Sequence, residues 1–177
     1  RGHFTIDELK AMFASPDVWR PERESSNGIG YADALMSYCF GLTCFLTGER
    51  PSAIRQLRWG DLEKDELTFR TTKTGKPRTV PIVPRLLDVL EELREDSVRI
   101  ADEDFIFTYD ESGEPIGRYW FRNAFRRVAT RLELPDRDQD GRRRTGYSLK
   151  VSFITHLIDN GADEMLVREY VGHSHTS

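Results

Sequence analysis

The last thirty residues of the chain combine two short helical patterns with a turn between them. Apolar side chains recur at helical spacing in the first pattern, at Leu149, Phe153, Leu157 and Ile158. Asn160-Gly161 predicts the end of that helix, because glycine adopts a left-handed cap at little cost. Any fold of this chain must therefore bury one face of a helix that begins near residue 148.

A second helix is predicted to follow, with Asp163 as its cap and Gly172 at its end. We expect its apolar face to consist of Met165, Leu166 and Tyr170. Polar side chains lie at the outer ends of this helix pair: Tyr147 and Lys150 on the first turn of the first helix, and His173 beyond the second. A hydroxyl and a cation at a helix N-terminus, facing a histidine, are suited to bind an oxyanion.

This stretch resembles the second signature box of the tyrosine recombinases (phage integrases), which reads H-x-L-R-H-T-F-A-T-H-L-L-x-x-G and then L-G-H-S. The matching residues are Leu149, Phe153, Thr155, His156, Leu157, Gly161, Gly172, His173 and Ser174. Two catalytic positions of the pattern differ, because Tyr147 replaces its first histidine and Lys150 replaces its arginine. An ammonium is a point charge and cannot bind two phosphate oxygens as a guanidinium does. His156, in the middle of the helix, is expected to be structural.

Residues 47–62 resemble the first box of the same family, T-G-x-R-x-S-E-L-x-x-L-x-W-x-D. Arg50 occupies the arginine position, directly before a helix that Pro51 is predicted to open. The resemblance implies that Arg50 binds the scissile phosphate; the alternative is an exposed loop arginine. Ala53 stands where the pattern has glutamate, so the buried contact that would orient this helix is in doubt.

A β-hairpin is predicted over residues 67–82, with alternating apolar residues on either side of a Thr-Gly-Lys-Pro turn. Lys73 matches the hairpin lysine of the family, whose implied role is general acid to the leaving 5′-oxygen. Lys76 and Arg78 are expected to hold phosphates. The alternative is that these lysines protect a sheet edge from pairing with another strand.

The remaining elements follow from spacing and turn residues. Thr5 and Glu8 form the pattern of a capping box. We expect further helices over residues 31–46, from Pro84 and from Arg118, and a third strand over residues 105–109. The helix from Pro84 should have one apolar side, made of Leu86, Leu87, Leu90 and Leu93.

Positive charge is concentrated between residues 118 and 150. This segment contains ten Lys or Arg against four Asp or Glu, a balance of +6, so the rest of a chain of net charge −4 carries −10. Such asymmetry favours one surface for a polyanion, the alternative being a solvated helix face with chance clustering. The residues expected to contact DNA here are Arg118, Arg122, Arg126, Arg142, Arg143 and Arg144.

Composition is that of a globular protein, with 38% hydrophobic and 32% charged residues. Cys39 and Cys44 lie in an apolar helical run, which predicts reduced, buried thiols in a cytoplasmic protein, and no zinc-ligand spacing is present. That run is too short to span a bilayer, so we expect no membrane association. No cofactor and no metal are expected.

The resemblance implies one α+β domain over residues 1–177, mainly α-helical with a small antiparallel sheet, without the family's N-terminal DNA-clamping domain. It implies a site-specific recombinase that cleaves and rejoins duplex DNA through a 3′-phosphotyrosyl intermediate. We expect a homo-tetramer on paired DNA sites and a monomer in isolation. None of the six tyrosines matches the family's nucleophile, expected about nine residues after His173, so it either follows Ser177 or never existed. The rival hypothesis is a degenerate domain that binds DNA without cutting it.

Overall fold

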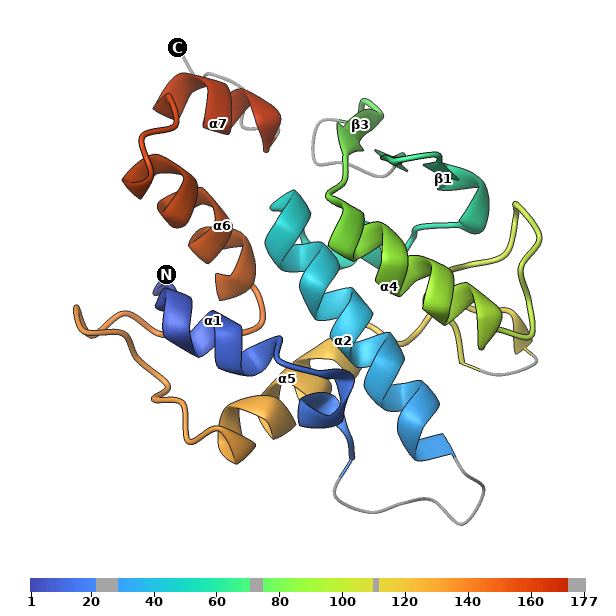
Figure 1. The fold of residues 1–177 in the computed structure, drawn as a ribbon, viewed down its shortest axis with the longest axis horizontal. Coiled ribbons are helices and arrows are strands. Elements are labelled where there is room, and N and C mark those ends of the chain that lie inside the picture. Colours follow the sequence, from blue (N-terminus) through green and yellow to red (C-terminus); the bar gives the residue numbers. More distant parts are fainter. Residues whose placement is uncertain (22–28, 71–74, 110–111, 172–177) are drawn as a thin grey trace.

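Helix α2, Ile29–Thr47, runs through the centre of the molecule (Figure 1). In this computed structural model, which describes residues 1–21, 29–70, 75–109 and 112–171, the helix is buried on all sides from Ala34 to Cys44. Two of its buried hydroxyls bond to the turn before them: Thr43 donates to the carbonyl of Cys39 and Thr47 donates to that of Thr43. A helix that is apolar all round needs partners on every face, and the rest of the chain supplies them.

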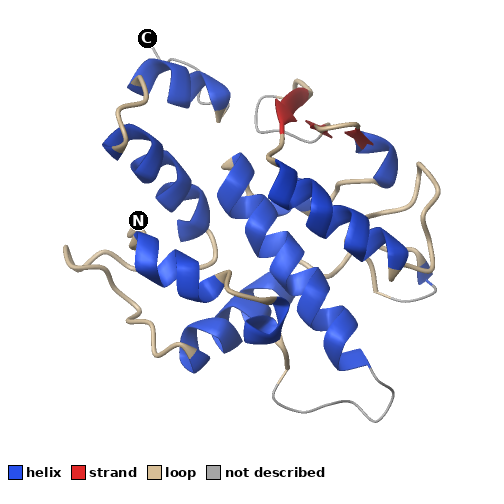
Figure 2. Cartoon of the chain, viewed as in Figure 1, coloured by secondary structure: helices blue, strands red, loops and turns tan. Residues whose placement is uncertain are grey.

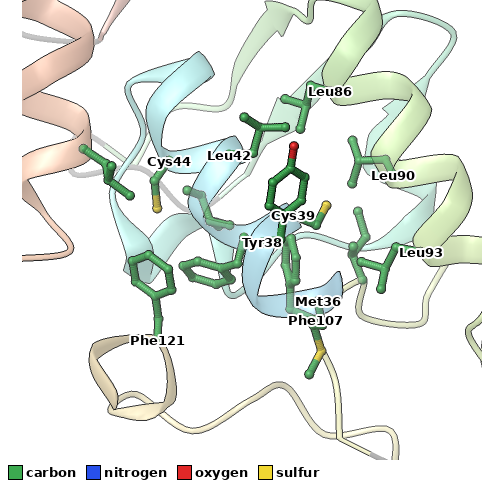
Figure 3. Packing of buried hydrophobic residues seen from close by; sticks show 14 of the residues in the cluster. Met36, Tyr38, Cys39, Leu42, Cys44, Leu86, Leu90, Leu93, Phe107 and Phe121 are labelled. Carbon is green, nitrogen blue, oxygen red and sulfur yellow. The ribbon is translucent and has the colours of Figure 1, made fainter. Parts of the chain in front are cut away.

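The partners of α2 come from both ends of the sequence (Figure 1). They are the short helix η1 (Pro16–Trp19) and the helices α4 (Pro84–Glu95), α5 (Trp120–Arg131) and α6 (Ser148–Asp159). Figure 3 shows Leu86, Leu90 and Leu93 of α4 on one side of α2 and Phe121 of α5 on another. The predicted apolar face of α4 is therefore confirmed.

The first helix, α1 (Ile6–Met12), begins at the predicted capping box. The Thr5 hydroxyl accepts from the amide of Glu8 at 3.2 Å, and the Glu8 carboxylate accepts from the amide of Thr5 at 2.8 Å. Leu9 and Met12 of α1 are buried.

A small antiparallel sheet of order β1-β2-β3 lies beside α4 (Figure 2). Its strands are β1 (Leu62–Glu63), β2 (Glu66–Phe69) and β3 (Arg78–Pro81). Leu67 pairs with Val80 and Phe69 with Arg78. Since side chains two apart share a face, Arg78 lies on the same face as buried Val80, toward the core.

The expected third strand over residues 105–109 is wrong. These residues form only isolated bridges, Arg58 to Phe105 and Thr108 to Pro115, and the third strand of the sheet is β1. Ile106 and Phe107 are consecutive and both buried, which is incompatible with one half-exposed strand face. The Ile106 amide donates to the carbonyl of Leu57, so this segment packs against the chain that follows helix α3 (Pro51–Ile54).

Helices α5, α6 and α7 (Glu164–Tyr170) follow the sequence pattern with two corrections. Helix α5 begins at Trp120 with Tyr119 at its cap, so Arg118 precedes the helix. Asp163 caps α7 as predicted, but Met165 and Leu166 are 59% and 65% exposed instead of buried. This two-turn helix contacts the protein along one side, and Val167 occupies that side.

These elements confirm a mainly helical domain with a small antiparallel sheet. Cys39 and Cys44 are free thiols, both buried as predicted, and burial raises the pKa of each above its ordinary value. Among the described residues, no helix is both long and apolar enough to cross a membrane.

Candidate functional site

The two motif boxes, about a hundred residues apart in sequence, meet at Gly48. This residue follows α2 in a left-handed conformation, with φ of +61°. A Cβ atom at this position would lie 2.7 Å from Cδ1 of Phe153 in α6 and 2.9 Å from Cγ1 of Val171 after α7. Only glycine allows the loop that carries Arg50 to approach these two side chains so closely.

Arg50 lies at the N-cap of α3, and Pro51 opens that helix as predicted. Its backbone amide donates to the Glu49 carboxylate at 2.8 Å. Its side chain is partly buried, and within the described part of the chain its guanidinium makes no hydrogen bond or ion pair. Arg50 is thus held by its backbone while its fork of donors remains available for a ligand.

Glu49, which sequence reasoning missed, is buried beside it, with 6% of its surface exposed. Its second carboxylate oxygen accepts from the guanidinium of Arg78 at 2.6 Å. Arg78 also donates to the carbonyl of Tyr170 and lies 5.5 Å and 5.6 Å from the ring centroids of Phe69 and Tyr170. Arg78 therefore joins β3 to the end of α7, and its expected contact with a phosphate stays a prediction.

Lys150 is 2% exposed, on the first turn of α6. Its ammonium lies 3.4 Å from the carbonyl of Val171. Burial lowers the pKa of Lys150 to about 8; the negative charge of Glu49 opposes this shift, and Arg78 and Arg50 add to it. Glu49, Arg50, Arg78 and Lys150 thus form one group, which we call the charge cluster.

Tyr147 lies at the N-cap of α6, half-buried, with the guanidinium of Arg1 4.2 Å above its ring centroid. It is three residues from Lys150 in sequence, yet its ring contacts Arg1 of the N-terminal segment. His156 is structural as expected: its Nε2 lies 2.8 Å from the carbonyl of Phe4. The Ser152 hydroxyl of the same helix accepts from the Phe4 amide.

Two of the predicted catalytic residues, Lys73 and His173, lie outside the described residues. Lys76, after the hairpin turn, is exposed. Their roles stay predictions.

Arg118, just before α5, and Arg122 and Arg126 of α5 form an exposed basic surface. The guanidinium of Arg118 lies 4.6 Å from the ring centroid of Tyr119, and that of Arg122 lies 4.5 Å from it. Arg122, Arg126 and Arg143 line one cleft of about 470 Å³ between α5 and the loop before α6. Arg142 is exposed and pairs with Asp140 at 3.2 Å.

Arg144, expected to contact DNA, is instead buried. Its guanidinium pairs with Glu8 at 2.8 Å and donates to the carbonyl of Pro135. It also lies 4.8 Å from the ring centroid of Phe4. Arg144 therefore attaches the arginine-rich loop to α1, and its donors are used within the protein.

One carboxylate among three cationic side chains leaves the charge cluster with excess positive charge. Such a group attracts an anion with several oxygens, and Arg50 offers paired donors to it. Among the described residues, no group of His, Cys, Asp and Glu is arranged to hold a metal ion.

Residues 23–177 match the model of the Phage integrase family. The chain belongs to this family. A putative integrase/recombinase, y4eF of Sinorhizobium fredii, is 30% identical over 163 residues, which cover 89% of this chain and 60% of that protein. Tyrosine recombinase XerD of Listeria innocua is 27% identical over 180 residues, covering 97% and 54%.

Solved structures share the fold. The XerH site-specific recombinase has a TM-score of 0.72 at 23% identity, covering 99% of this chain and 48% of that one. The catalytic core of lambda integrase has a TM-score of 0.68 at 14% identity, covering 100% and 94%. The chain spans only part of the curated relatives that it matches: 60% of y4eF, 54% of XerD and 39% of an integrase/recombinase protein of Methanocaldococcus jannaschii.

Gly48→Ala should separate the two motif boxes. The left-handed conformation costs a non-glycine residue about 1–2 kcal/mol, and overpacking against Phe153 and Val171 adds about 1–3 kcal/mol. We expect the free energy of unfolding, measured by urea denaturation, to fall by about 3 kcal/mol. Gly117→Ala, whose Cβ would meet open space, is the control; equal losses in both variants would contradict the proposed close approach.

Lys150→Met should stabilise the protein at pH 7. A pKa lowered from 10.5 to about 8 means that holding the ammonium in its folded site costs about 3 kcal/mol below pH 8. Between pH 8 and 10.5 the unfolded state binds more protons, so the parent gains stability as pH rises. Lys150→Met lacks this gain. The difference in free energy of unfolding between variant and parent, measured by urea denaturation, should therefore shrink as pH rises from 8 to 10.5. If the free energy of unfolding changes with pH in the same way in parent and variant, the pKa of Lys150 is not lowered by folding.

Proposed function

We propose that this chain is the catalytic domain of a tyrosine-type site-specific recombinase, which cleaves and rejoins duplex DNA through a 3′-phosphotyrosyl intermediate. The observation that supports this most is the charge cluster, in which Arg50 of the first box and Lys150 of the second lie beside one buried carboxylate. Residues so distant in sequence converge on one site for a phosphate.

Each side chain of the site has a role in this proposal. Arg50 binds the non-bridging oxygens of the scissile phosphate through its guanidinium, and Lys150 adds positive charge to the same site. His173 donates a hydrogen bond to the same oxygens, and Lys73 protonates the leaving 5′-oxygen. Tyr147 stands where the family pattern has a histidine, and in this proposal its phenol donates a hydrogen bond to the phosphate. The nucleophile is a tyrosine beyond Ser177, which attacks the phosphorus and releases the 5′-oxygen.

The exposed arginines of α5 and of the loop before α6 hold the DNA backbone next to the site. The recombinases of similar fold support this partner: XerH is bound to its difH substrate, and lambda integrase forms a tetramer on a Holliday junction. We infer by analogy that this protein assembles as a tetramer on paired DNA sites and is monomeric without DNA.

A second candidate function is DNA binding without cleavage. The burial of Lys150 favours it, because an ammonium with 2% exposure presents less charge to a phosphate than an arginine fork would. The two candidates differ in whether a covalent protein–DNA adduct forms.

Arg50→Ala decides whether the site acts on a phosphate. In the intact protein, the variant should lose covalent adduct formation with a nicked suicide substrate by at least ~10²-fold, since it removes a donor to the developing charge. Arg55→Ala, on the adjoining turn, is the matched control and should lose much less. Equal losses would indicate a general charge effect; an adduct that is missing from the parent would favour the binding-only function.

Arg122, Arg126 and Arg143, changed together to alanine, test the DNA surface. Each phosphate contact contributes to the salt dependence of binding, so the slope of log affinity against log salt should fall by up to about 3. Duplex binding would be measured across a salt series. A variant that loses the same charge elsewhere, at Lys10, Lys64 and Arg94, should retain the parent slope. A triple variant with unchanged slope would move the DNA to another face.

A further inference from the structure

The Glu49 carboxylate occupies the centre of the charge cluster. One of its oxygens accepts from the backbone amide of Arg50 at 2.8 Å, and the other accepts from Arg78 at 2.6 Å. The backbone amide of Glu49 donates to the Thr47 hydroxyl, at the end of α2. Two hydrogen bonds thus hold the buried carboxylate, and a third holds the backbone of Glu49.

Lys150 lies in the same junction as this carboxylate: its ammonium is 3.4 Å from the carbonyl of Val171, whose side chain packs against Gly48, the residue before Glu49. The titratable and charged groups that act on it are Glu49 and Arg50 from the loop after α2, Arg78 from β3 and the Cys44 thiol from α2. Arg50 and Arg78 repel its ammonium, and the thiol is neutral because burial raises its pKa well above the ordinary value. Glu49 supplies the attraction that offsets both cations.

The first-box pattern places a glutamate three residues after its arginine, where this chain has Ala53. Ala53 is buried, with 6% of its surface exposed, and brings a methyl group to the inside of α3. The carboxylate in this region therefore comes from the residue before Arg50 instead of the third residue after it.

We propose that Glu49 is the positioning residue of this site, whose carboxylate orients Arg78 and the Arg50 backbone and keeps Lys150 protonated for a phosphodiester. This inference rests on the proposed function for its phosphate, but the protonation of Lys150 can be measured without it. Glu49 touches no substrate in this role. It acts through Arg78, the Arg50 backbone and Lys150, and its effect should be seen in a pH profile.

The direct test is the titration of Lys150 in the intact protein, followed by NMR of its ε-CH₂ group with lysine labelled in ¹³C and assigned by loss of the signal in Lys150→Arg. Glu49→Gln keeps the size of the side chain and removes its charge. We expect the midpoint to fall by about one pH unit or more, as when an opposite charge is lost from a nearby group. Glu91→Gln, on the exposed face of α4, loses the same charge and should match the parent.

Glu49→Asp keeps the charge but withdraws it by one methylene, so its midpoint should lie between those of the parent and Glu49→Gln. It serves as the deciding variant if Glu49→Gln does not fold. An unchanged midpoint in either folded Glu49 variant, or an equal fall in Glu91→Gln, would overturn the proposal.

Adduct formation with the suicide substrate, measured against pH, connects the titration to function. The alkaline limit of the parent should move to lower pH in Glu49→Gln, with up to about tenfold less adduct at pH 8, since one unit in pKa is a factor of ten in the charged form. Lys150→Arg should lack this limit. If the parent forms no adduct, the recombinase proposal fails while the NMR titration still decides the role of Glu49; a pH profile unchanged in Glu49→Gln would overturn that role.

Discussion

The close packing of Gly48 against Phe153 and Val171 is the contact on which the site depends. It brings the end of the central helix α2 against α6 and the end of α7, so that Arg50 and Lys150 share one environment. Arg78 reinforces the same junction from the sheet through Glu49 and the carbonyl of Tyr170. The glycine turn at Gly48 and the buried ion pair between Glu49 and Arg78 thereby fix three parts of the chain relative to each other. These parts are residues 47–50, 78–81 and 148–171.

Much of the fold could be predicted from local signals. The capping box at Thr5, the opening of α3 at Pro51 and the end of α6 before Gly161 follow from groups within a few residues. The apolar spacing of α4 likewise identified its buried face. The segment 105–109 was misjudged because two adjacent buried residues and a run of β-formers resemble a strand even where no partner strand is available.

The direction of charged side chains could be predicted less well, because it depends on distant partners. Arg144 is buried since Glu8, far away in sequence, meets it. For Arg78 a signal existed: alternation with Val80 placed it on the inner face of the hairpin. Glu49 had a weaker signal, as an acidic residue next to Arg50 and just after an apolar helix. The roles of Lys73 and His173 remain predictions from motif positions.

The two buried thiols of α2 have a practical consequence for studying this protein. Cys39 and Cys44 are the only cysteines of the chain, each is about 0–1% exposed, and the pKa of each is raised by burial. An alkylating reagent needs an accessible thiolate, so it reacts with neither while the central helix stays packed. The rate of alkylation thus reports how often the middle of the molecule opens, and no cysteine has to be introduced for the measurement. Comparing this rate with and without DNA would tell whether a bound duplex reduces opening of the core.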